Sequence, residues 1–234
     1  MTIISVLSED KTSALPRQGW RSYKCGNRVG CASFKGDIMA RRIVRIPETH
    51  IKKYDVIYID PPWSYRDKAL AGKRGACCKY SVMSKDDLKN LNIQKIASDN
   101  CCLFIWITMP KLDEVFDIIK QWGFEYKTNA FTWVKKNKKA DTWFWGMGRW
   151  TRANAELCLL ATKGKPKRES AAVHSIIDER IMGHSKKPDI VRDKIVELFG
   201  DIPKVEIFAR EAAEGWDVLG NEIDGKDIKD VLNG

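Results

Sequence analysis

Apolar runs alternate along the chain with amphipathic segments of about ten residues. Strands are expected at 55–59 (DVIYI) and 101–108 (CCLFIWIT). The second run is apolar almost throughout, as in a strand whose two faces are both covered. Further strands are expected at 131–134, 155–162, 205–208 and 216–219. Strands that alternate with helices predict a layered α/β fold built on a mostly parallel sheet.

Three helices carry boundary signals. Ser84-Lys85-Asp86-Asp87 has the pattern of a capping box, with apolar Leu88, Leu91 and Ile96 behind it. A second helix is closed by Gly123, and a third opens at 188–189 and ends at Gly200. The apolar stripe of the second helix comprises Leu112, Val115, Phe116, Ile119 and Trp122.

The composition fits one domain of ordinary size. The chain has 234 residues, of which 44% are hydrophobic. Residues 1–40 mix Ser, Gly, Lys and Arg without periodicity, so we expect an extension with little regular structure before a domain at 41–234. The apolar runs are too short to span a bilayer, and the N-terminal segment lacks the apolar core of a signal peptide. We therefore expect a cytoplasmic protein.

The net charge indicates what kind of molecule the protein binds, and the cysteine content indicates its redox compartment. A formal charge of +10 and a pI near 9.2 favour a polyanionic partner, and nucleic acid is the expected one. The basic residues cluster at 135–139 and 163–168. The seven cysteines are odd in number and include two adjacent pairs, which suits a reducing compartment better than a disulfide framework. Zinc-type spacing is poor, so no metal is expected.

The stretch Tyr58–Asp67 (YIDPPWSYRD) is the most informative part of the sequence. Asp60 follows a strand, where open parallel sheets bind ligands. Pro61 restricts the backbone of Asp60 as well as its own, and prolines have no N–H to donate. The corner therefore predicts a rigid pair of acceptors, the Asp60 carboxylate and the Pro61 carbonyl, beside the flat ring of Trp63. The ordinary alternative is an Asp-Pro turn in which Trp63 caps the core.

Asp60-Pro61-Pro62-Trp63 resembles the signature of the permuted S-adenosylmethionine-dependent N6-adenine methyltransferases. More narrowly, it is similar to the family of the eukaryotic messenger-RNA adenosine methyltransferase and its bacterial and phage relatives. Further matching segments span about 55–225 in the expected order. They are KYSVMSKDDL (79–88), AELCLLATKGKP (155–166), HSKKPD (184–189), EIFAR (206–210) and GWDVLGNE (215–222).

This resemblance implies a Rossmann-like methyltransferase fold with one antiparallel strand, helices on both faces and a permuted motif order. Its implied cofactor is S-adenosyl-L-methionine. Asp60 and the Pro61 carbonyl would take hydrogen bonds from the adenine amine, and Pro62 would hold the corner. Trp63 and Tyr80 would line the base. The implied cofactor contacts are Asp60, Lys187, Phe208, Arg210, Asn221 and Glu222.

The chemistry agrees with these implied roles. An aryl amine is a poor nucleophile because its lone pair is delocalised into the ring. Two fixed acceptors can hold its hydrogens so that the lone pair faces the methyl group, and alignment of this kind is worth ~7–11 kcal/mol. The Asp60 carboxylate would stabilise the positive charge that develops on the amine. A base in a duplex must leave the stack to react.

The segment 142–156 (TWFWGMGRWTRANAE) interleaves rings with arginines, which suits unstacked bases and phosphates. An aromatic core segment is the alternative. The expected substrate-contacting residues are Tyr65, Tyr80, Trp145, Arg149, Arg152 and Lys165.

Several alternatives stay open at this point. A catalytically silent nucleic-acid-binding partner on the same fold would be expected to lose the acid or the ring of the signature, and both are present here. Cytosine methyltransferases usually have serine where Asp60 stands, so adenine is favoured. The compact chain resembles phage and bacterial members that act on DNA, so DNA is favoured over RNA. A homodimer is also left open, and a phage-encoded protein would act in the bacterial host cytoplasm.

Overall fold

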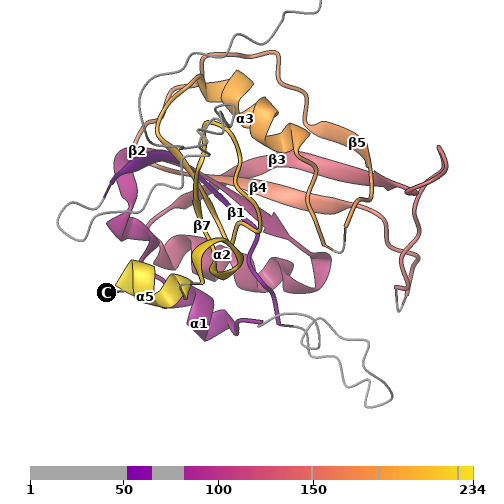
Figure 1. Cartoon of the computed structure of the whole chain (residues 1–234), viewed down its shortest axis with the longest axis horizontal. Helices are drawn as coiled ribbons and strands as arrows, with labels where there is room; N and C mark the ends of the chain where they lie inside the picture. Colours follow the sequence, from indigo (N-terminus) through magenta and orange to yellow (C-terminus); the bar gives the residue numbers. More distant parts are fainter. Residues whose placement is uncertain (1–51, 65–81, 149, 184, 226, 234) are drawn as a thin grey trace, which may run out of the picture. The chain divides into compact units, whose positions relative to one another are not determined.

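The structure is a computed structural model that describes residues 52–64, 82–148, 150–183, 185–225 and 227–233 (Figure 1). The expected extension at 1–40 and its boundary with the domain lie outside these residues and stay predictions.

Seven strands form one sheet in the order β5-β3-β4-β2-β1-β6-β7. Their bounds are β1 Tyr54–Ile59, β2 Ala97–Ile107, β3 Glu125–Lys136, β4 Glu156–Lys163, β5 Ile176–Arg180, β6 Lys204–Ile207 and β7 Asp217–Leu219. β4 pairs antiparallel with both β2 and β3, and every other neighbouring pair is parallel. Within the described sheet β4 therefore runs alone against six strands, which confirms the predicted arrangement.

Helices cover both faces of the sheet, as predicted. The helices are α1 Lys85–Lys89, α2 Leu112–Gln121, α3 Ile190–Phe199, α4 Asn221–Asp224 and α5 Ile228–Asn233, with short 3₁₀ turns at Ile93–Lys95 and Met109–Lys111. Alternate residues of β1 belong to two separate core clusters. Ile57 and Ile59 pack with α1, α2 and α5, whereas Val56 and Tyr58 pack with α3 (Figure 1).

The strand order brings the two ends of the domain together. β1 lies between β2 and β6, so the last strands of the chain pair beside the first one. All residues of β2 from Cys101 to Ile107 are buried, as its apolar run predicts for a central strand. The carboxyl ends of β1, β2 and β6 meet at one edge. Because β4 is antiparallel, its first residues lie at this same edge, with Leu157 opposite Ile107.

Some local predictions need correction. The Ser84 capping box forms with both of its hydrogen bonds, but α1 ends after five residues. Leu91 and Ile96 are buried outside it, beside a 3₁₀ turn. Phe116 was expected in the apolar stripe of α2, yet it is 40% exposed and packs edge-on against Tyr126. The strand β5 was not predicted.

Membrane-spanning helices and metal-ligating clusters are both absent from the described residues. No described helix is both long enough and apolar enough to cross a membrane. The described His, Cys, Asp and Glu side chains form no group of three or more that could hold a metal ion. The thiols of Cys101, Cys102 and Cys158 are buried and unpaired.

Candidate active site

The Asp-Pro-Pro-Trp corner leaves the carboxyl end of β1 and is fixed by backbone hydrogen bonds. Trp63 N donates to the Pro61 carbonyl at 2.8 Å, and Met83 N donates to the Pro62 carbonyl at 2.8 Å. Each of these carbonyl oxygens therefore already accepts one hydrogen bond from a backbone N–H of the protein. A carbonyl oxygen has two lone pairs, so the Pro61 oxygen retains capacity for one further hydrogen bond.

Trp63 anchors the corner to the neighbouring strand. Its ring is 4% exposed, and Nε1 donates to the carbonyl oxygen of Trp106 in β2 at 3.1 Å. Trp106 Nε1 in turn donates to the Tyr58 hydroxyl at 2.6 Å. Trp63 belongs to the core cluster beneath the corner while also lining the cavity beside it. Most of the Trp63 side chain therefore packs in the core, as the alternative interpretation expected, while a small part of it lines the cavity.

Asp60 lies in a chain of alternating charges. Lys187 Nζ, from the loop before α3, donates to Asp60 Oδ2 at 2.7 Å. The same ammonium lies 3.4 Å from Glu156 Oε2, and Lys135 Nζ pairs with the other oxygen of Glu156. The side chain of Lys187 is only 11% exposed, and its ammonium lies 5.6 Å from the centre of the Trp106 ring. One buried cation therefore serves two carboxylates.

Burial and the neighbouring opposite charges shift the pKa values of Asp60, Glu156 and Lys187 in opposite directions. Burial raises the pKa of the Asp60 carboxyl, and the Lys187 ammonium offsets only part of that rise. For Glu156, burial is outweighed by Lys187 and Lys135 together, and the pKa is lowered. Burial also opposes the charge of Lys187, but Asp60 and Glu156 raise the pKa of its ammonium overall. Lys187 therefore stays protonated, while Asp60 binds a proton more readily than an exposed aspartate does.

A cavity of about 250 Å³ opens beside Asp60. It brings together the described residues expected to act in catalysis and in cofactor binding, which come from both ends of the domain. They are Asp60, Pro61, Pro62, Trp63, Lys187, Phe208, Arg210, Asn221 and Glu222. The Asp60 side chain is 24% exposed, and the described residues provide no hydrogen-bond donor to its Oδ1. Among the described residues, Oδ1 is thus an acceptor without a donor partner.

The far wall of the cavity follows β6. Phe208 comes directly after this strand with φ at 62°, a left-handed conformation that is unusual for a bulky residue. Its ring is half-buried against the core. Arg210 Nε lies 3.8 Å from Glu222 Oε1 across the cavity mouth. The wall therefore combines an aromatic side chain with a charged pair.

Gly220 sets how closely this wall packs. A Cβ at this position would lie 2.2 Å from the backbone oxygen of Ala209. We expect Gly220→Ala to push Asn221 and Glu222 away from β6 and to lower the free energy of unfolding by about 1–3 kcal/mol. Chemical denaturation measures this loss. Gly183→Ala is the matched control, because its Cβ would meet nothing closer than 4.0 Å; equal stability of both variants would contradict the prediction.

The predicted substrate contacts lie in different places. Trp145 and Arg152 are exposed on the loop between β3 and β4, outside the residues that line the cavity. Lys165 follows the end of β4, at the opposite edge of the sheet from Asp60 and roughly 20 Å away by strand rise. The structure does not bring Lys165 to the site. Tyr65, Tyr80 and Arg149 lie outside the described residues. The roles of all six stay predictions.

Part of the basic cluster at 135–139 is neutralised within the protein. Lys135 pairs with Glu156, and Lys136 lies within 3.0 Å of both Asp141 and Asp178. Lys138 and Lys139 are exposed. The cluster therefore offers fewer charges to a polyanion than the sequence indicates.

Several cavity residues were not identified from the sequence. Glu156 stands inside the AELCLL segment, but only the register of β4 on β2 places its carboxylate near Asp60. Thr108 follows β2 just as Asp60 follows β1, which is a signal that could have been used. Asp227 and Lys229 flank the start of α5 and line the cavity as well.

The fold and the site together define a Rossmann-like α/β protein with a buried ion chain beside a cavity at the strand ends. The family described as MT-A70 matches residues 54–222, so this chain belongs to the MT-A70 family. It is 34% identical over 201 residues to the type II methyltransferase M.MunI from Mycoplasma sp, covering 78% of this chain and 83% of that protein.

Eukaryotic relatives are more distant. The human N(6)-adenosine-methyltransferase catalytic subunit METTL3 is 28% identical over 182 residues, which cover 76% of this chain and 30% of METTL3. The Drosophila melanogaster N(6)-adenosine-methyltransferase MT-A70-like protein is also 28% identical, over 76% of this chain and 28% of its own length. This chain thus spans most of the bacterial relative but under a third of these two eukaryotic ones.

Proposed function

We propose that the protein is an S-adenosyl-L-methionine-dependent methyltransferase that modifies the exocyclic N6 amine of adenine in nucleic acid, and specifically in DNA. The observation that carries the proposal is the convergence of the Asp60 corner, Lys187 and the segment after β6 on one cavity, in a chain of the MT-A70 family.

The described residues fit this cofactor chemically. An amino-acid group carries an ammonium and a carboxylate side by side, and the cavity provides the carboxylates of Asp60 and Glu156 next to the Lys187 ammonium. Asn221 and Glu222 offer polar atoms to a ribose, and Phe208 offers an aromatic surface to an adenine. When bound, the cofactor supplies a methyl group that its sulfonium has already activated.

Asp60 has three tasks in this proposal. Oδ1 accepts a hydrogen bond from the target amine, and the negative charge stabilises the positive charge that develops on its nitrogen. The Pro61 carbonyl is the second acceptor, through its remaining lone pair. Burial raises the pKa of the Asp60 carboxyl, so Oδ1 is also suited to hold the proton that the methylated amine must lose.

A separate observation favours DNA over RNA as the substrate. One relative that this chain covers over most of its length is a bacterial type II methyltransferase. The RNA alternative draws support from the relatives named as N(6)-adenosine-methyltransferases. A silent partner subunit is disfavoured, because Asp60 is present and faces the cavity.

The proposal is tested by incubating the protein with methyl-labelled cofactor and a nucleic acid free of N6-methyladenine. Duplex genomic DNA, the same DNA after heat denaturation, and total RNA are compared, and digestion identifies the labelled nucleoside. We expect N6-methyldeoxyadenosine from DNA. Label in RNA alone would support the RNA alternative, and label on cytosine would refute the adenine assignment.

A further inference from the structure

The exposed tryptophans of the described structure are gathered on one segment. Trp143, Trp145 and Trp150 are 46%, 53% and 91% exposed, and all three lie on the arm, defined here as residues 137–155 between β3 and β4. The other five described tryptophans are at most 5% exposed. Trp150 is thus nearly as accessible as a free side chain, which is rare for so large an apolar group.

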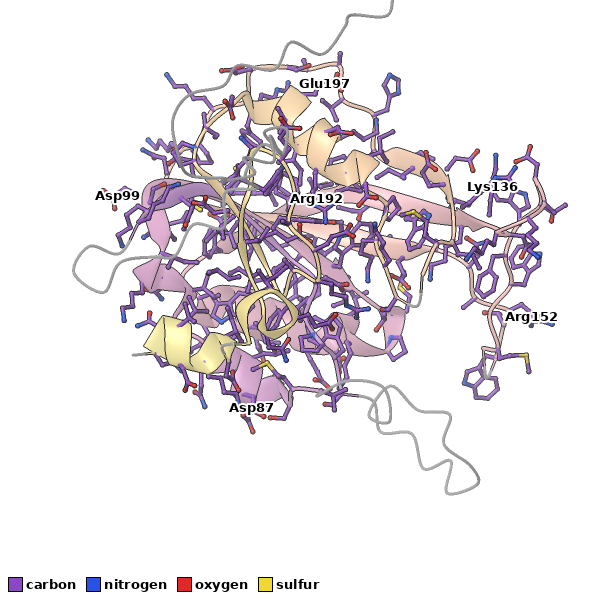
Figure 2. The ribbon with its side chains drawn as sticks, viewed as in Figure 1. Asp87, Asp99, Lys136, Arg152, Arg192 and Glu197 are labelled. Atoms are coloured by element: carbon purple, nitrogen blue, oxygen red, sulfur yellow. The ribbon has the colours of Figure 1, made fainter. Side chains whose placement is uncertain are left out.

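The arm is held in a defined shape. Asn137 N donates to the Thr142 carbonyl, and Phe144 N donates to the Lys135 carbonyl at 2.9 Å. The side-chain amide of Asn154 bridges the carbonyl oxygens of Lys135 and Phe144. These hydrogen bonds tie the arm to the end of β3. Figure 2 shows the arm extending away from the helices, with Arg152 labelled on it and Lys136 labelled at the end of β3 where the arm begins.

The end of the arm, residues 146–153, is called the tip loop below, and its described residues 146–148 and 150–153 form a closed turn. Gly146 N donates to the Ala153 carbonyl at 2.7 Å and closes it. Arg152 reinforces the closure, because Nε donates to the Gly146 carbonyl at 2.9 Å and Nη2 to the Trp145 carbonyl at 3.2 Å. Gly148 permits a tight turn, since a Cβ there would lie 1.8 Å from the Thr151 carbonyl oxygen. Hydrogen bonds thus hold the tip loop while Met147, 93% exposed, and Trp150 project from it.

The charge of the arm favours a polyanion. The hydrogen bonds of Arg152 go to neutral carbonyls, so its positive charge is not compensated by them. The sequence of the arm contains a single acid, Asp141, which pairs with Lys136 at the end of β3. Its basic residues are Lys138, Lys139, Arg149 and Arg152.

Both ends of the arm lie next to a residue that lines the active-site cavity. Glu156, which lines the cavity, is three residues beyond Ala153, so the end of the tip loop lies within about 11 Å of it. Lys135 at the other root of the arm pairs with the same Glu156. The distance of about 11 Å from Glu156 to the end of the tip loop is comparable with the ~12 Å width of a duplex major groove.

A protein partner fits the tip loop less well than a nucleic acid does. Stable protein interfaces use about 20–30 residues on each side, whereas the tip loop has eight residues on a narrow turn. Isolated rings with interleaved cations are the arrangement that stacks on bases and binds phosphates.

We propose that the tip loop enters the base stack of a duplex and that Trp150, together with the exposed Met147 of the same loop, fills the space left by the adenine that turns into the cavity. This inference rests on the proposed function, because a base must leave the duplex to reach Asp60. Large side chains that wedge between base steps are a known way to stabilise an opened duplex.

The test compares Trp150→Ala and Trp150→Phe with wild-type protein on duplex genomic DNA and on the same DNA after heat denaturation. Loss of one base–ring contact is expected to reduce methyl transfer to the duplex at least tenfold. Transfer to denatured DNA should change less than about threefold, since the target base there is already unstacked. Phenylalanine should restore most of the duplex activity because it keeps a ring. Tyr126→Ala, an exposed ring on β3 outside the arm, is the control and should be neutral.

The other possible results would overturn either the wedge or the proposed function. Equal losses on both forms of DNA would show a general nucleic-acid contact and overturn the wedge. Unchanged duplex activity of Trp150→Ala would overturn it too, and a shift from dimer to monomer on gel filtration would then assign the tip loop to self-association. If wild-type protein acts on duplex alone, failure of phenylalanine to rescue is the overturning result. A wild-type protein inactive on every DNA would instead refute the proposed function.

Discussion

Asp60→Asn is expected to reduce methyl transfer by about two to three orders of magnitude. Asparagine keeps the shape of the side chain and one acceptor oxygen, but it removes the negative charge that faces the developing cation. Loss of one preorganised electrostatic contact at a reacting centre costs on this scale. The substitution also leaves Lys187 with Glu156 as its remaining carboxylate.

The measurement is the rate of labelled methyl transfer at saturating cofactor, with cofactor affinity determined separately. Asp55→Asn is the matched control, because Asp55 lies at the other end of β1 and accepts a hydrogen bond from Ser98 Oγ at 2.6 Å. That variant should keep nearly full activity. Retention of more than a third of wild-type activity by Asp60→Asn would remove the central assumption of the mechanism.

The rate of the wild-type enzyme should also depend on the charge of Asp60. Burial raises the pKa of its carboxyl above that of an ordinary aspartate. Because the active form is ionised, activity should fall on acidification at a higher pH than an exposed aspartate would give.

The sequence predicts the centre of the sheet better than its edges. The run that forms β2 is apolar enough for burial on both faces to be inferred directly, and β2 is indeed buried from Cys101 onward. β5 has the sequence IIDER, and most of its residues are exposed. Its extended conformation comes from pairing with β3, a tertiary contact that local pattern does not reveal.

In the site too, some residues can be identified from the local sequence and others only from tertiary contacts. Asp60 could be found because two prolines and a tryptophan make its neighbourhood chemically unusual. Glu156 could not be found in this way, since a glutamate at the start of a strand is ordinary and only strand register gives it a role. Lys187 was expected to contact the cofactor, and the structure adds that it already pairs with Asp60, 127 residues away.

Lys187→Met is therefore expected to destabilise the fold as well as the site. Methionine fills a similar volume but leaves Asp60 and Glu156 buried without their shared cation. Breaking a buried ion pair from one side costs about 3–5 kcal/mol of unfolding free energy. Lys186→Met is the matched control, because Lys186 is 32% exposed and pairs with Asp189 and Glu211 at the surface. Surface pairs are worth at most about 1 kcal/mol.

The sign of the pH dependence separates this explanation from simple loss of packing. In the wild type, the raised pKa of Lys187 and the lowered pKa of Glu156 stabilise the fold between their titrations. That contribution is lost as pH rises through the folded pKa of Lys187 or falls through that of Glu156. In Lys187→Met the pKa of the Asp60 carboxyl should rise further, since burial is then unopposed by its ammonium partner, whereas Glu156 keeps Lys135; charging Asp60 therefore favours unfolding. Denaturation curves at pH 8 and pH 5 should then show the stability gap narrowing on acidification, whereas a pure packing defect would leave the gap unchanged.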